Sequence, residues 1–299
     1  MWPIEQVRLA AGDAGTELLK TGVDWDAYCN IPAMNPSTLV AGTKSMRHLR
    51  YAWEHPRADT DNLLWGRAVH CLLFEPKEFE HRYIAWREVD KDGKPKKRIG
   101  TKWDEVVKTA TEFSLEILSL KQWDSALEAA QSFVKEPDVQ ELIKAGQGEV
   151  TLLTTECGIQ CRGRVDWIAT GLALTDLKTT KNIEAAKFGR DFYAFHYDIK
   201  LGLYRRWLNK LTGKDWPVKC ITLENTPPYD VAVVPVAEEV LDQGAAKGLG
   251  ILARLRTSID TGLWPGIAGG QEYYLETPAW HMEDVELSGA EEYHETEPV

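Results

Sequence analysis

Apolar residues change their spacing along this chain, from a helical period before residue 149 to a strand period after it. Side chains that recur three and four positions apart predict helices, and side chains that alternate predict strands. The predicted strands are 149–153, 159–168, 172–179, 218–224 and 229–235. The predicted helices are one that starts after Asn35, then 61–75, 101 to about 145, 183–192, 197–211 and 240–263. This order predicts an α/β fold, a central mixed β-sheet flanked by helices, with helical additions on its N-terminal side.

The helix predicted over 61–75 carries a histidine on an apolar face. Thr60 and Asp61 can cap its start, and Pro76 closes it. Gly66 lies one turn before His70 and would let a backbone or a metal come close. A single histidine in such a place is more often a hydrogen-bonded core residue than a ligand. The helix by itself therefore assigns no role to His70.

The stretch from Gly163 to Thr180 carries the chemistry of the chain. Side chains alternate along a strand, so Asp176 and Lys178 share a face. On the preceding strand, polar residues ending in Asp166 occupy the face opposite an apolar row. Carboxylates hold Mg²⁺ and an ammonium group can orient an attacking hydroxide, so the two strands predict a metal-dependent phosphodiesterase. Glu149, at the start of the strand before, is either a third carboxylate of this site or an exposed strand-end residue.

The composition is that of a globular protein of one large or two small domains. A chain of 299 residues with 43 % hydrophobic and 27 % charged residues can bury a substantial core. Its apolar runs are too short to span a bilayer and its start lacks a signal-peptide pattern, which predicts no membrane association and a cytoplasmic location. The five cysteines are scattered, so neither a disulfide framework nor a zinc site is expected.

Charge is segregated along the chain, and the net charge of -11 does not exclude a nucleic-acid partner. Between Arg87 and Lys102, seven basic residues face three acidic ones, in a segment that Gly93 and Pro95 mark as a loop. Such a loop is either solvated or tracks a DNA backbone. The chain after Met282 has seven acids and no lysine or arginine, which we interpret as a solvated tail or as a DNA mimic for the basic loop. The acids are Glu283, Asp284, Glu286, Glu291, Glu292, Glu295 and Glu297.

Three short motifs, in order, resemble the RecE-type exonucleases of phages and prophages, which are RecB-like nucleases of the PD-(D/E)xK superfamily. Residues 66–76 resemble the family's G-x-x-x-H-x-L-L-x-E-P helix, Gly163-Arg164-Val165-Asp166 its G-R-x-D strand, and residues 176–180 its D-x-K-T-T segment. The resemblance covers about residues 35 to 265. It implies a PD-(D/E)xK core at 36–265, with a helical part at 36–145 and a catalytic sheet with following helices at 146–265. Residues 1–35 would be an N-terminal extension and 266–299 a C-terminal segment with the acidic tail.

The resemblance also implies the roles of the site residues. His70, Asp166 and Asp176 would bind Mg²⁺, or Mn²⁺ in its place, with help from the Leu177 carbonyl. Lys178 would position the attacking water, and Glu149 matches a supporting acidic position. The implied enzyme digests the 5′ strand of linear duplex DNA from its end, forms a homo-oligomeric ring, and leaves 3′ single strands for a RecT-like annealing protein.

The family often has Gln-x-x-x-Tyr on the next helix, where this chain has Lys200 and Tyr204. Lys200 can contact a phosphate as a point charge without the acceptor of an amide. We expect the DNA contacts to be made by Arg47, Lys94, Lys96, Lys97, Arg98, Arg162, Arg164, Lys200 and Tyr204. Two other interpretations stay open: a single-strand-specific or endonucleolytic RecB-like nuclease, and a non-catalytic DNA-binding module of the same fold.

Overall fold

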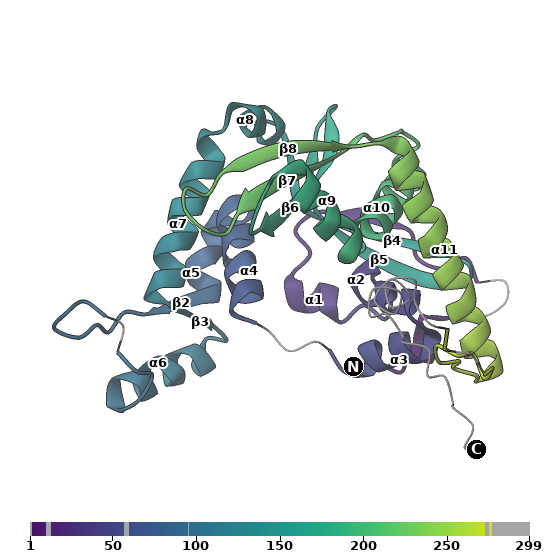
Figure 1. Ribbon diagram of the computed structural model, residues 1–299, viewed down its shortest axis with the longest axis horizontal. Coiled ribbons are helices and arrows are strands. Elements are labelled where there is room, and N and C mark those ends of the chain that lie inside the picture. Colours follow the sequence, from purple (N-terminus) through teal and green to yellow (C-terminus); the bar gives the residue numbers. More distant parts are fainter. Residues whose placement is uncertain (1, 10–12, 57–59, 95, 273–274, 277–299) are drawn as a thin grey trace, which may run out of the picture.

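A six-stranded mixed sheet packed between helices forms the body of the computed structural model, which describes residues 2–9, 13–56, 60–94, 96–272 and 275–276 (Figure 1). The strands are β1 (Leu18–Lys20), β4 (Gly146–Glu156), β5 (Ile159–Ala169), β6 (Ala173–Thr180), β7 (Val218–Glu224) and β8 (Val231–Val236), and they lie side by side in this order. A separate pair is formed by β2 (Tyr83–Trp86) and β3 (Glu116–Ser119). The predicted α/β architecture with a mixed sheet is confirmed.

The helices cover both faces of this sheet (Figure 1). The α-helices are α1 (Trp25–Cys29), α2 (Pro36–Leu39), α3 (Met46–Glu54), α4 (Asp61–Phe74), α5 (Phe79–Arg82), α6 (Thr101–Glu112), α7 (Leu120–Lys135), α8 (Pro137–Ile143), α9 (Ala185–Ala194), α10 (Tyr197–Thr212) and α11 (Glu238–Thr261). Short 3-10 helices are η1 (Ile4–Val7), η2 (Val40–Thr43) and η3 (Pro76–Glu78). Among the described residues, no helix combines the length and the apolar character that crossing a membrane requires.

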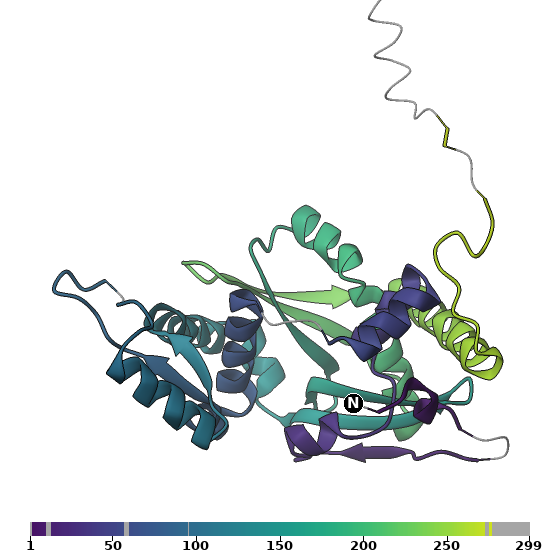
Figure 2. The same cartoon turned by 90° about the horizontal axis from the view of Figure 1, so that it is seen from below.

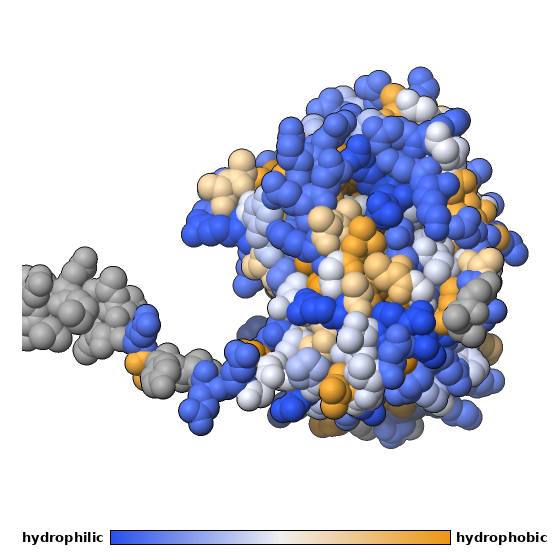
Figure 3. All heavy atoms as spheres, turned by 90° about the vertical axis from the view of Figure 1, so that its right-hand side faces the viewer, coloured by the Kyte–Doolittle hydropathy of each residue, from blue (hydrophilic) through white to orange (hydrophobic). Residues whose placement is uncertain are grey.

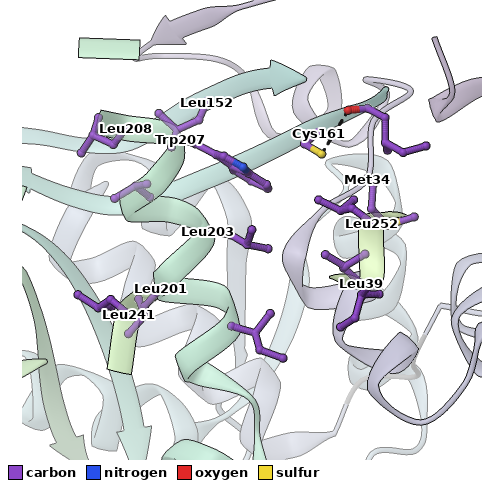
Figure 4. Close-up of a cluster of buried hydrophobic side chains, with 14 of the residues drawn as sticks. Met34, Leu39, Leu152, Cys161, Leu201, Leu203, Trp207, Leu208, Leu241 and Leu252 are labelled. Carbon is purple, nitrogen blue, oxygen red and sulfur yellow. Dashed lines mark hydrogen bonds between the residues drawn. The ribbon is translucent and has the colours of Figure 1, made fainter. Parts of the chain in front are cut away.

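Two hydrophobic cores lie on opposite faces of the sheet. On one face, Leu201, Leu203 and Trp207 of α10 pack with α11 and with the apolar row of β5, in which Cys161 is fully buried (Figure 4). On the other face, α4, α7 and α8 pack on Leu177 and on the strands β7 and β8. The face over α11 is mostly hydrophilic, with hydrophobic residues gathered near its centre (Figure 3). A slip of one residue would move every side chain of a strand to the opposite face and disrupt both cores, so this burial fixes the strand register.

The strands β5 and β6 pair over only three positions before they part. Trp167 to Ala169 pair with Thr175 to Ala173 next to the turn that contains Gly171. Asp166 and Asp176 would form the next pair, but the ladder stops before them. Beyond this fork the edge of β5 is taken by Met34, whose N–H donates to the Gln160 carbonyl over 2.9 Å and whose carbonyl accepts from Arg162 N over 2.9 Å. The fork places both carboxylates where the sheet opens.

The first 35 residues join the body of the protein. The strand β1 pairs antiparallel with β4 and forms one edge of the sheet. Asp24 caps α1 through its side chain, and Tyr28 of this helix is buried. The segment that the sequence sets apart as an extension therefore supplies one strand and one wall of the fold.

One expectation was wrong, because residues 101–145 are not helical throughout. The helix α6 ends at Glu112, Ser114 adopts a φ of 56°, and residues 116–119 form β3, which pairs parallel with β2. Phe113 is 63 % exposed, so the stripe that indicated a long helix is not buried along its length. Pairing of Ile117 with Ile84 decides the local structure instead. These elements form a lobe beside the sheet, from whose far end the basic loop projects (Figure 2).

Candidate metal centre and active site

Three side chains from three elements converge beside the fork. His70 of α4 directs Nδ1 at Glu149 Oε1 over 3.1 Å and Nε2 at Asp166 Oδ2 over 2.8 Å. One ligand atom from each of the three residues lies within 4.8 Å of the other two, so the group could hold a metal ion. The prediction that His70 and Glu149 lie beside Asp166 agrees with this arrangement. Asp176 stands next to this group and is not among its three members.

The charge of His70 is set by its two carboxylate neighbours. Burial alone would lower the pKa of His70, but Asp166 and Glu149 outweigh burial and raise the pKa to about 10. Burial would raise the pKa of Asp166, yet the positive charge of His70 beside it holds that pKa below its ordinary value. The site therefore sets an ionised Asp166 beside a positively charged His70, whose other ring nitrogen lies 3.1 Å from Glu149.

The glycine one turn before His70 is needed for packing. A methyl group built on Gly66 would lie 3.2 Å from Thr179 Oγ1 of β6, closer than side chains usually approach. Thr60 caps the helix by accepting from Leu63 N, as the sequence predicts. The helix α4 is thereby held close to β6, and His70 reaches β5.

At the fork, backbone and carboxylate groups face one another. Leu177 N donates to Asp166 Oδ2 over 2.7 Å. In a strand the N–H and the C=O of one residue point to the same neighbour, so the Leu177 carbonyl also faces β5 and the site. The Leu177 side chain is buried in the core on one face of the sheet. Leu177 can therefore offer a backbone oxygen as a ligand without exposing its side chain.

Lys178 lies on the same face of β6 as Asp176, as predicted, and its ammonium group contacts Asp176 Oδ2. The Asp176 side chain is 6 % exposed and that of Lys178 15 %. Burial would lower the pKa of Lys178, but Asp176 and Asp166 raise it above its ordinary value. Lys178 is thus a fixed positive charge beside the carboxylates, and it can orient a nucleophile without acting as a base.

Glu149 is held in an unusual backbone conformation. It has a φ of 51°, within the left-handed region that non-glycine residues seldom adopt. It lies across from Asp166 in the β4–β5 ladder, at the one position where the pairing is interrupted. This interruption turns the Glu149 carboxylate toward His70 and Arg164.

Arg164 stabilises the candidate metal-ligand group of His70, Glu149 and Asp166 through its contact with Glu149. Its side chain is 7 % exposed and contacts Glu149, while Nη1 donates to the Val23 carbonyl over 2.9 Å. Its guanidinium also lies 5.5 Å from the ring centre of Trp25 and 5.7 Å from that of Tyr28. These contacts give Arg164 a positioning role that the sequence did not reveal, and a contact of this side chain with DNA stays a prediction.

Arg162 is tied to the same N-terminal segment. Its Nη1 donates to the Tyr28 carbonyl and, over 3.0 Å, to the Ile31 carbonyl, and the guanidinium lies 4.9 Å from the Tyr28 ring centre. Its Nε is buried and has no hydrogen-bond partner among the described residues. Arg162 and Arg164 both line a cavity of about 710 Å³ that contains the metal group.

Tyr197, at the start of α10, has two lysines against its ring. Lys178 Nζ is 4.7 Å and Lys200 Nζ 5.1 Å from the ring centre. Tyr204, one turn after Lys200, lines the cavity. A methyl group on Gly163 would lie 2.7 Å from the Tyr204 ring, so the glycine of the G-R-x-D strand makes room for this tyrosine.

The remaining predicted DNA contacts lie outside this cavity. Arg47 is an exposed residue of α3. In the basic loop, Lys96 pairs with Glu88 over 3.6 Å and the Arg98 guanidinium lies 5.5 Å from the ring centre of Trp103. Lys94 and Lys97 are exposed in the same loop. DNA binding by these residues stays a prediction, and the acidic tail lies outside the described residues.

Fold and site together define an α/β nuclease core of the PD-(D/E)xK type. Residues 39–277 match the family described as "PDDEXK-like domain of unknown function (DUF3799)". The chain belongs to this family. No curated protein matches the chain. The fold is similar to that of the crystal structure of a "putative exonuclease" from Eubacterium rectale, with a TM-score of 0.56 and 14 % sequence identity over 88 % of this chain and 98 % of that one.

Proposed function

We propose that this protein is a Mg²⁺-dependent exodeoxyribonuclease that digests the 5′ strand from the ends of linear double-stranded DNA. The observation that carries this proposal is the convergence of His70, Glu149 and Asp166 next to the Asp176–Lys178 pair at the β5–β6 fork. A metal-ligand group beside a lysine that keeps its charge suits metal-assisted hydrolysis of a phosphodiester. The action at ends is supported by the RecE-type motifs and by the name of the similar solved structure.

The donor set fits a divalent cation. Two carboxylates and an imidazole lie within 4.8 Å of one another, and the Leu177 carbonyl faces the same opening. Oxygen donors suit Mg²⁺, and the imidazole makes Mn²⁺ an effective substitute. When bound, such an ion neutralises the phosphate and lowers the pKa of a bound water.

Four residues of the chain have the remaining roles in the proposed reaction. Lys178 keeps its positive charge and orients the attacking water toward the phosphorus. Asp176 holds Lys178 in place and faces the fork as a further carboxylate. Arg164 keeps Glu149 turned toward His70, so that the ligand group stays assembled in the absence of DNA. Lys200 would contact a phosphate close to Lys178, and the position of both amino groups against the Tyr197 ring supports this role.

We further propose that the protein works as a homo-oligomeric ring through which the surviving strand passes. A RecT-like annealing protein would then use the 3′ single strand for recombination. These two steps rest on the resemblance of three motifs alone.

The test is digestion of linear duplex with Mg²⁺, comparing 5′-labelled with 3′-labelled ends, and with closed circular duplex and single strands as further substrates. Early release of the 5′ label from linear duplex, with circular duplex left intact, is the expected result. Cutting of circular duplex, or exclusive digestion of single strands, would contradict the proposed specificity and favour the corresponding RecB-like activity. Absence of hydrolysis of every substrate with Mg²⁺ and with Mn²⁺ would leave a DNA-binding module.

A further inference from the structure

Two exposed aromatic side chains stand at the corner between α9 and α10. Tyr193 and Phe195 are each 52 % exposed, although the same helix buries Phe188 and Phe192 to 5 % and 6 %. The two buried rings already anchor this end of the helix. The two exposed rings, about half in water, therefore contribute nothing to the core. The anchored side gives the exposed rings a rigid base.

The aromatic chain leads from this surface to the lysine of the site. The ring centre of Phe195 lies 5.8 Å from that of Tyr197, and Tyr193 packs on Phe192, which itself lies 6.0 Å from Tyr197. Lys178 Nζ is 4.7 Å from the Tyr197 ring centre. The ring of Tyr197 therefore separates Phe195 from Lys178, and the rings of Phe192 and Tyr197 separate Tyr193 from it.

The charges around this corner favour an anionic partner. Lys181 and Arg190 are exposed, and Lys200 lies against the Tyr197 ring. Among the nearby acidic residues, Asp198 is buried and pairs with Lys247 over 2.8 Å, and Asp191 is partly buried and accepts a hydrogen bond from Thr180 Oγ1 over 3.5 Å. Flat rings interspersed with cations match an unpaired strand, whose bases stack and whose phosphates carry the negative charge.

We propose that the α9–α10 corner, defined by Tyr193 and Phe195 with their neighbouring cations, is a stacking platform for unpaired nucleotides of the DNA that enters or leaves the site. This inference rests on the proposed function, because the platform would bind the DNA strand that the active site cleaves. Stacking is tolerant of sequence, since every base has a π-face. The platform would hold the end of the strand open next to Lys178 without selecting a sequence.

The experiment measures the affinity of the full-length protein for a fluorescent oligothymidylate in EDTA, so that hydrolysis does not interfere. The Tyr193→Ala/Phe195→Ala variant should bind at least about tenfold more weakly, because each stacked ring contributes about fivefold or more. Tyr193→Phe/Phe195→Tyr exchanges the two rings and should bind within about twofold of the original protein. Tyr193→Leu/Phe195→Leu keeps apolar bulk without a ring and should bind as weakly as the alanine variant.

A matched control is Phe113→Ala, which removes another exposed ring, 63 % exposed, at the end of α6. It should leave oligothymidylate binding unchanged. Equal affinity of the alanine variant and the original protein would overturn the platform, as would absence of binding by the original protein or the same loss in Phe113→Ala. A change of oligomeric state on sedimentation, with unchanged oligonucleotide affinity, would assign the corner to protein contacts and also overturn it.

Failure of the proposed function would look different. Hydrolysis of bis(4-nitrophenyl) phosphate, a diester without bases, reports on the metal site alone. If the original protein hydrolyses neither this reporter nor DNA with Mn²⁺, the nuclease assignment fails. If it hydrolyses both, and the alanine variant binds the oligonucleotide normally, only the platform fails.

Discussion

Two groups of cations flank the carboxylates of the site, and they differ in what holds them. On one side, Arg162 and Arg164 contact backbone carbonyls, Glu149 and the faces of Trp25 and Tyr28. On the other side, Lys178 contacts Asp176, and the amino groups of Lys178 and Lys200 both lie against the ring of Tyr197. Each arginine contacts several groups at once, whereas the two lysines share one aromatic ring.

This difference follows from the chemistry of the two side chains. A guanidinium presents five donors in a rigid plane and can bind several acceptors and stack on a ring at the same time. An ammonium group is a compact charge on a flexible stem. The arginine side therefore suits a framework that keeps Glu149 and the N-terminal wall in place, and the lysine side suits contact with water and phosphate.

The largest effect is expected on the lysine side. Lys178→Ala should reduce Mg²⁺-dependent digestion of linear duplex by about a hundredfold to a thousandfold, because a preorganised charge at the reacting group is lost. Asp176→Ala should abolish digestion of the same linear duplex. Both variants should keep the circular dichroism spectrum of the original protein. Full activity in either of them would refute the site assignment. Lys200→Ala, the matched variant at the second lysine near the Tyr197 ring, should lose about tenfold or less.

Substitution of Arg164 should mainly lower the free energy of unfolding of the protein. Arg164→Met removes one buried partner of Glu149 and leaves it with His70 alone, which should lower the free energy of unfolding by about 3 kcal/mol. Urea denaturation measures this loss. Arg190→Met, at an exposed arginine of α9, should change stability by less than about 0.5 kcal/mol. Equal stability of both variants would show that Arg164 does not stabilise the fold through Glu149.

Substitutions of Tyr197, whose ring both lysines contact, should have a smaller effect on the rate of digestion. Tyr197→Leu should lower the rate of duplex digestion by about fivefold, since a cation over a ring contributes about 1 kcal/mol. Tyr197→Phe keeps the ring and should stay close to the original rate. If Tyr197→Phe loses as much as Tyr197→Leu, the hydroxyl matters and the positioning of Lys178 by the ring is refuted.

The basic loop should have the smallest effect. Neutralising Lys94, Lys96, Lys97 and Arg98 should weaken duplex binding and reduce the slope of log affinity against log salt by about one to two. The reduction is modest because Lys96 already pairs with Glu88 and Arg98 already lies over Trp103. An unchanged slope would show that the loop does not touch phosphate.

Much of the site follows from strand periodicity and three motifs. Alternation places Asp176 and Lys178 on one face, and the structure has them there. His70 could not be assigned from its helix alone, because an apolar face suits a core histidine equally well. Its role depends on where α4 meets β5, which no local pattern encodes.

Other features escaped because they depend on tertiary contacts. The expectation for Arg164 came from its place in a polar row, and a row cannot show that its guanidinium is 7 % exposed. Tyr197 fits an apolar helical stripe, and only the packing of α10 beside β6 reveals two lysines on its ring. The β2–β3 pair was missed because its partners are separated by the whole of α6.

The hydrogen bonds of Met34 to β5 bear on how this protein can be shortened. The family match begins at residue 39, which invites expression of a fragment that starts there. Such a fragment would lose β1 and Met34 and would expose backbone edges of both β4 and β5, which are templates for intermolecular pairing. It should therefore aggregate, and a usable fragment has to begin before Leu18.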